Sequence, residues 1–168
     1  MKVVKVQKGK HRFRPLRLRL FLNKSRLAFS VCFNYTAKYD IGSNQSDINK
    51  LFGIGYLPGH HRNSARFGWR YNKDINKIDI FSYVYDSGKR KATFLCSIAI
   101  NVPHVFILEI SPIRNQYGFT VVQRNVNMII SSYDERVQHI PAIGYFLNSY
   151  FGGDEKAPHD IDYTMNEV

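Results

Sequence analysis

Residues 27–35 read LAFSVCFNY, and this stretch decides the fold class. Every second position holds a large apolar or aromatic residue, namely Leu27, Phe29, Val31, Phe33 and Tyr35. Because successive side chains of a strand point to opposite faces, the alternation predicts a strand with one face against a core. The spacing does not fit the 3.6-residue period of a helix.

The same two-residue period recurs along most of the chain. We expect further strands at 16–22, 50–57, 65–71, 77–85, 91–100, 105–110, 118–124, 126–130, 143–151 and 160–165. Turn residues at 23–25, 72–74 and 86–88 predict hairpins, and only 132–139 favours a short helix. About ten short strands in 168 residues predict an all-β, single-domain β-sandwich or jelly roll over 1–168.

The net charge is concentrated before residue 40. The first 39 residues contain eleven Lys and Arg and no acid, whereas 13 basic and 13 acidic residues follow. We therefore expect residues 1–15 to form a basic N-terminal arm. The cations predicted to bind an anionic partner are Lys8, Lys10, Arg12, Arg14, Arg17 and Arg19. That partner is a nucleic acid backbone, an acidic glycan or an acidic protein surface, and the alternative is a solvated arm without a partner.

Composition sets the remaining bounds. A hydrophobic content of 44% and an aromatic content of 14% exclude a disordered chain, and no apolar run approaches the roughly 20 residues of a membrane span. The first 15 residues lack the apolar stretch of a secretory signal, so we expect a cytoplasmic protein that does not act at a membrane. Cys32 and Cys96 fall within predicted strands and are expected to be free thiols.

A candidate ligand groove lies at residues 59–71, GHHRNSARFGWRY. Alternation places Ala65, Phe67, Trp69 and Tyr71 on one face of this strand and Arg66, Gly68 and Arg70 on the other. We expect Phe29, Phe67 and Trp69 to be buried and the arginines, with Arg17 and Arg19, to point outward. Arg66 and Arg70 would grip a carboxylate or phosphate, with His60, His61 and Asn63 at the rim. The alternative is an ordinary solvated strand face.

Signals for catalysis, metals and cofactors are weak. The sequence contains no recognised catalytic motif, and its histidines lack the spacing of a zinc site, so we assign no catalytic residue, metal or cofactor. One reaction stays open, the β-elimination of an acidic polysaccharide. It needs an Arg or Asn to neutralise the sugar carboxylate and a His or Tyr as base, which Arg66, Arg70, Asn63, His61 and the tyrosines would supply.

Three segments carry a family resemblance: 49–56 (NKLFGIGY), 60–71 (HHRNSARFGWRY) and 150–161. Together they resemble a family of small β-sandwich proteins of gut bacteria and their tailed phages. The resemblance implies a jelly-roll-like fold and either a virion component or a glycan-binding module. Our leading expectation is a non-enzymatic structural or adaptor protein, oligomeric within a larger assembly such as a phage virion. The alternative is an acidic-polysaccharide-binding module or a polysaccharide lyase.

Overall fold

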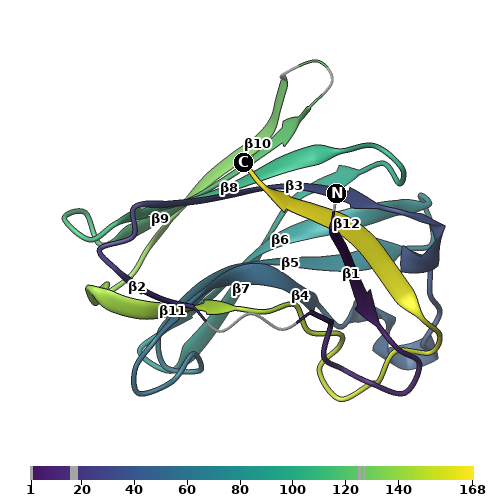
Figure 1. The fold of residues 1–168 in the computed structure, drawn as a ribbon, viewed down its shortest axis with the longest axis horizontal. Coiled ribbons are helices and arrows are strands. Elements are labelled where there is room, and N and C mark those ends of the chain that lie inside the picture. The colour runs from purple at the N-terminus through teal and green to yellow at the C-terminus, as the bar shows by residue number, and fades with distance from the viewer. Residues whose placement is uncertain (1, 16–18, 125, 127) are drawn as a thin grey trace.

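The computed structural model describes residues 2–15, 19–124, 126 and 128–168, and 57% of it is strand. Two six-stranded antiparallel sheets pack face to face (Figure 1), which confirms the predicted all-β sandwich. Two short 3-10 helices, η1 (Tyr35–Ala37) and η2 (Gly42–Ser46), lie between β3 and β4.

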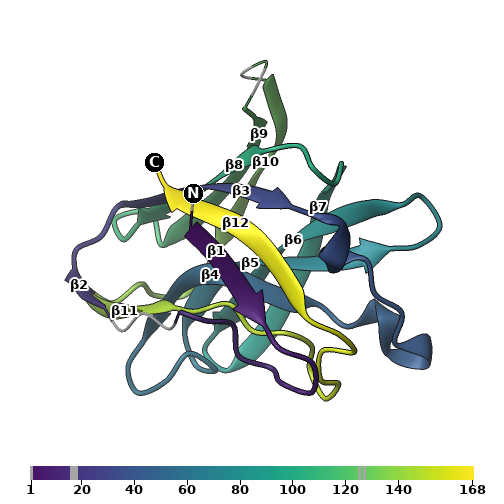
Figure 2. The ribbon, with the colours of Figure 1, turned by 45° about the vertical axis from the view of Figure 1, so that its right-hand side comes forward.

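Sheet A contains both described ends of the chain. Its order is β1 (Lys2–Val6), β12 (Ile161–Glu167), β3 (Arg26–Phe33), β8 (His104–Ser111), β9 (Gln116–Gln123) and β10 (Met128–Arg136). Because β1 pairs with β12, the two ends lie close together (Figure 2).

Sheet B carries the candidate site. Its order is β2 (Leu20–Leu22), β11 (Ile143–Leu147), β4 (Asn49–Tyr56), β5 (Ser64–Asn72), β6 (Lys77–Asp86) and β7 (Lys89–Ile98). The predicted hairpins at 72–74 and 86–88 are confirmed as the β5–β6 and β6–β7 connections. In the second turn Ser87 and Gly88 both have positive φ, as a two-residue hairpin with strand-like twist requires.

The core between the sheets is aromatic. Trp69 and Phe67 of β5 are fully buried, and Phe29 of β3 is 5% exposed, as the alternation predicted. Their ring centroids lie 4.9 Å (Phe33–Trp69) and 5.2 Å (Phe67–Phe106) from rings of sheet A. The inner face of β5 is therefore fixed by packing, and its even-numbered residues face outward.

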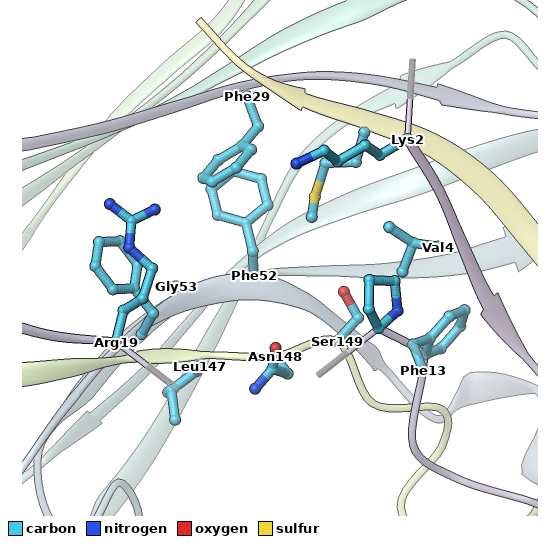
Figure 3. A pocket seen from close by; sticks show the side chains of 13 residues that line it. Lys2, Val4, Phe13, Arg19, Phe29, Phe52, Gly53, Leu147, Asn148 and Ser149 are labelled. Atoms are coloured by element: carbon cyan, nitrogen blue, oxygen red, sulfur yellow. The ribbon is translucent and has the colours of Figure 1, made fainter. Parts of the chain in front are cut away.

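A small cavity remains between the sheets near β1. Figure 3 shows Phe29 and Phe52 meeting across the gap, with Val4 on one side and Ser149 below. Its volume of about 40 Å³ has room for a few water molecules and is far below that of a typical ligand site.

Two predictions of local structure are wrong. Residues 16–22 and 27–35 do not form a hairpin, because β2 pairs with β11 in sheet B while β3 belongs to sheet A. The turn at 23–25 thus carries the chain from one sheet to the other. Residues 132–139 do not form a helix, because residues 132–136 continue β10, paired with β9. Leu16, Arg17 and Leu18 lie outside the described residues.

The N-terminal segment packs against the sandwich. Val4 and Val6 of β1 and Phe13 are buried, while Lys8, Lys10, Arg12 and Arg14 are exposed. Backbone hydrogen bonds from Gly9 N to Ala157 O (2.8 Å) and from Phe151 N to His11 O (2.7 Å) hold the segment in place. Its cations are therefore presented from an ordered backbone.

Candidate ligand-binding groove

A groove of about 740 Å³ lies over the outer face of sheet B. Strands β4 to β7 supply its floor. The loop that joins β4 to β5 and residues 147–154 supply its walls. The lining residues are Arg12, Lys50, His60, His61, Ser64, Arg66, Tyr83, Tyr85, Arg90, Leu147, Asn148, Ser149, Tyr150, Gly152, Gly153 and Asp154. The volume lies in the range of sites that hold small ligands or a short stretch of a polymer.

Glycines lie opposite three polar floor residues of β4 and β5. In the register of these strands, Lys50 is opposite Gly68, Arg66 is opposite Gly53 and Ser64 is opposite Gly55. A Cβ at Gly53 would overlap the backbone of Ala65 and Arg66, and one at Gly55 would lie 2.9 Å from His60 Cβ. Each polar side chain of the floor therefore has a neighbour that takes up no side-chain space.

Arg66 is the most deeply placed charge of the groove. The residue is 6% exposed, and its Nη2 donates to Asn148 O at 2.7 Å, but its Nε has no hydrogen-bond partner. The neighbouring Ser64 Oγ is also buried without a partner. Burial lowers the pKa of Arg66 to about 10, so the guanidinium remains charged at neutral pH. Buried donors without partners are rare in native proteins and call for an explanation.

Lys50 adds a second cation to the floor. Its Nζ donates to Gly152 O at 2.9 Å and lies 5.2 Å from the centre of the Tyr83 ring. Burial and then the charge of Arg66 lower the pKa of Lys50 to about 8. Lys50 is therefore still largely protonated at pH 7.

Tyrosines and histidines line the other side of the groove. Tyr83 is opposite Arg66 and Tyr85 is opposite Ser64 on the neighbouring strand β6. Burial and then the adjacent Tyr85 raise the pKa of Tyr83. The His61 ring stacks on Tyr85 with centroids 5.3 Å apart. Burial, followed by the charges of His61 and Arg66, lowers the pKa of His60.

The groove is strongly cationic. Arg12, Lys50, Arg66 and Arg90 line it together with a single acid, Asp154. Among the residues that the structure describes, no ion pair involves any of these four cations. The groove therefore offers net positive charge beside flat aromatic rings, an arrangement suited to an anionic ligand.

The structure brings together only some of the residues predicted for this site. His60, His61 and Arg66 line the groove, whereas Asn63 and Arg70 do not. Asn63 Oδ1 accepts a hydrogen bond from Ser87 N, and Arg70 pairs with Asp79. Arg66 is on the outer face as predicted, but it is buried there and not solvated.

The predicted N-terminal cations are also divided. Arg12 lines the groove, Arg19 pairs with Glu167 at 3.2 Å, and Arg17 lies outside the described residues. Five further lining residues were not predicted from the sequence: Lys50, Ser64, Tyr83, Tyr85 and Arg90. The alternation of 77–85 placed both tyrosines on one face, but only the strand order of sheet B puts that face beside Arg66.

No metal centre is assigned from the described residues. They contain no group of three or more His, Cys, Asp or Glu side chains that could hold an ion. Cys32 and Cys96 are both free thiols. In the same part of the chain, no helix has the length and apolar character needed to span a membrane.

Comparison with known proteins supports the fold. No protein-family model and no curated protein matches the sequence. A crystal structure of scytalido-glutamic peptidase with a transition state analog inhibitor is similar, with a TM-score of 0.55 and 10% identity over 98% of this chain and 84% of that one. The xylan β-1,4-xylosidase from Bacillus halodurans C-125 gives a TM-score of 0.53 and 8% identity over 96% of this chain.

The extent of these matches differs. The chain covers 31% of the length of the xylosidase. A CBM2 module of an evolved Dit from Lactobacillus casei BL23 phage J-1 matches at a TM-score of 0.46 and 12% identity, over 86% of this chain and 61% of that module, and we base no argument on it. At these identities the likeness shows that the chain shares a β-sandwich fold with proteins of several activities, and function has to be argued from the groove.

Proposed function

We propose that this chain binds an acidic polysaccharide in the groove on the outer face of sheet B. The observation that carries the proposal is Arg66, a buried guanidinium that no described carboxylate pairs with and whose Nε has no partner. A buried charge is costly unless it is paired. A carboxylate that enters the groove would supply the missing counter-charge and form charge-assisted hydrogen bonds.

The other lining residues favour a sugar chain as the carrier of that carboxylate. Tyr83, Tyr85 and Tyr150 present flat rings with hydroxyl groups, which can pack against sugar rings and bond to their hydroxyls. Arg12 and Arg90 add further positive charge to the lining, and a polymer with a repeated anionic group can use several such cations at once. The groove thus matches a chain of uronate residues in both charge and surface type.

The test is binding to a polyuronate and to the same polymer after its carboxyl groups have been reduced to alcohols. We expect the polyuronate to bind with affinity that falls as salt concentration rises, and the reduced polymer to bind at least tenfold more weakly. A single-stranded DNA of similar charge serves as a competitor. Equal binding of the native and reduced polymers, or tighter binding of the DNA, would contradict the proposal.

A second function is favoured by the ordered N-terminal cations. Lys8, Lys10 and Arg14 are exposed and lie outside the groove lining, on a segment that hydrogen bonds hold to the sandwich. Such a fixed basic surface suits an acidic protein surface or nucleic acid backbone in a larger assembly, such as a virion in which the chain is oligomeric.

This second function has its own test. Replacing Lys8, Lys10 and Arg14 by Ser should flatten the salt dependence of binding to the assembly partner or to DNA, because fewer counterions are then released. Polyuronate binding should be retained, since the groove is untouched. Salt dependence that is unchanged in the triple variant would remove the N-terminal cations from any binding role.

A further inference from the structure

We infer that the groove also cleaves its ligand, by β-elimination at a 4-linked uronate, with Arg66 and Lys50 on the carboxylate, His60 as base and Tyr83 as acid. The inference rests on the proposed function, because the uronate has to bind first. It assigns a reaction and residue roles to side chains that line one groove.

The reaction balances without a co-reactant. His60 removes the proton from C5 of the uronate, and the electron pair of that C–H bond forms a C4–C5 double bond. The bond between C4 and the glycosidic oxygen breaks, and the leaving oxygen takes the proton of the Tyr83 hydroxyl. Proton transfer through solvent from His60 to the Tyr83 phenolate restores both residues. The products are a chain with an unsaturated end and a chain with a new reducing end, and no water or oxidant is consumed.

Removal of the C5 proton requires that the adjacent carboxylate be neutralised. The negative charge that develops at C5 is delocalised onto the carboxylate oxygens, so cations fixed at that position stabilise the transition state more than the ground state. Arg66 and Lys50 suit this role because they are close enough for the charge of Arg66 to lower the pKa of Lys50, and neither forms an ion pair with a described carboxylate.

His60 suits the role of base. It lies beside Gly55, the residue opposite Ser64, and contributes to the same groove wall. Burial and the nearby charges of His61 and Arg66 lower the pKa of His60, so its imidazole is neutral at pH 7 and has a nitrogen free to accept a proton.

Tyr83 suits the role of acid for the opposite reason. It is directly opposite Arg66 on β6, and its ring lies 5.2 Å from Lys50 Nζ. Burial and Tyr85 raise the pKa of Tyr83, which keeps its hydroxyl protonated. Two titratable groups whose environments shift their pKa values in opposite directions are a general indication of an acid and base pair.

The experiment measures the ultraviolet absorbance of the C4–C5 double bond during incubation with a set of 4-linked polyuronates. The set includes polymannuronate, polyguluronate and polygalacturonate, because the structure does not distinguish among their sugar configurations. We expect wild type to produce unsaturated ends from one of them. His60→Gln and Tyr83→Phe should each lower the rate about 10²- to 10⁴-fold while the polymer still binds.

Two matched substitutions outside the groove serve as controls. His139→Gln and Tyr35→Phe change exposed residues of the same types and should keep the wild-type rate. Binding of polyuronates without unsaturated product would overturn this inference and leave the proposed function standing. An undiminished rate in both His60→Gln and Tyr83→Phe would overturn the residue roles, and absence of binding would overturn both proposals.

Discussion

Strand β5 carries two arginines on the same face, and their surroundings are opposite. Arg70 donates through Nε and Nη2 to Asp79 Oδ2, both at 3.2 Å, and its guanidinium lies 5.0 Å from the centre of the Phe81 ring. Arg66, four residues earlier, is more buried, and among the described residues it makes one hydrogen bond, from Nη2 to the backbone oxygen of Asn148. Arg70 is therefore paired with a carboxylate within the fold, whereas no described carboxylate pairs with Arg66.

The difference lies in what faces each arginine across the sheet. Asp79 is directly opposite Arg70 on β6, and it also accepts from Ser97 Oγ at 2.6 Å and from Asn72 Nδ2 at 3.1 Å. Arg66 has Tyr83 opposite on β6 and Gly53 opposite on β4. The two arginines lie on the same face of the same strand. Their different environments therefore come from the residues opposite them on the neighbouring strands.

The contrast between Arg66 and Arg70 depends on how the inner face of β5 packs in the core. Truncating the largest side chain of that face should have the largest effect on stability. Trp69→Ala should lower the free energy of unfolding by about 3–5 kcal/mol, because it leaves a large cavity in the aromatic core. Chemical denaturation of wild type and variant measures this loss. A loss below about 1 kcal/mol would mean that β5 is not fixed as described.

The contribution of Arg70 to stability is tested by removing its carboxylate partner, Asp79. Asp79→Ala should lower the free energy of unfolding by roughly 3 kcal/mol, because Arg70, Asn72 and Ser97 all lose their acceptor. Arg66→Met should leave stability within about 1 kcal/mol of wild type or raise it, since it removes a buried charge without a carboxylate. Urea titrations measure the free energy of unfolding of both variants. Equal destabilisation by Asp79→Ala and Arg66→Met would contradict the difference between the two arginines.

Binding should show the reverse order. Arg66→Met should weaken polyuronate binding roughly 10- to 100-fold, the effect of losing one or two charge-assisted hydrogen bonds. Arg70→Met should leave the affinity within about twofold, because Arg70 does not line the groove. Calorimetric titration of both variants measures the ratio, and a larger loss in Arg70→Met would reverse our assignment.

The pH dependence of binding sharpens the role of Lys50. The free groove has Lys50 with a pKa of about 8, and a bound carboxylate raises that pKa. Affinity should therefore be constant from pH 6 to about pH 7 and fall as pH rises through about 8, where the free protein loses the proton that the complex keeps. Affinity measured in a pH series should show this fall in wild type and not in Lys50→Met; a flat wild-type profile would exclude Lys50 from the anion contact.

The smallest effect is expected at the rim. His60→Ala combined with His61→Ala should change the free energy of unfolding by no more than about 0.5 kcal/mol, because both lie in a loop that holds no metal cluster among the described residues. Thermal unfolding with and without a chelator checks this. A loss of several degrees shared by the double variant and the chelated wild type would point to a structural metal.

Sequence patterns correctly predicted the features that depend on one strand alone. The alternation in 65–71 identified both faces of β5 and the burial of Trp69 and Phe67. It failed where the outcome depends on pairing between distant strands. The turn at 23–25 has the composition of a hairpin, yet β2 finds its partner in β11, more than a hundred residues away.

The same limit on prediction from sequence applies to the candidate site. Arg66, His60 and His61 come from one continuous segment and were identified together. Lys50, Tyr83 and Arg90 come from three other strands, and their convergence depends on the strand order and on the bulge between Lys50 and Gly53. Arg70 was grouped with Arg66 because no local pattern shows that Asp79 lies opposite it.

The glycines opposite Lys50, Arg66 and Ser64 have a consequence for recognising this site in other proteins. A side chain at Gly53 would collide with β5 whatever its chemistry, and one at Gly68 would collide with Ile48. Variation in the cations would change the charge of the groove, whereas a side chain at one of these glycines would displace the neighbouring residues that pack against it. The charged positions can therefore vary without disturbing the packing of β4 against β5, whereas the glycine positions cannot. In a distant relative whose charged residues differ, glycines at positions matching 53, 55 and 68 would indicate the same packing of β4 against β5.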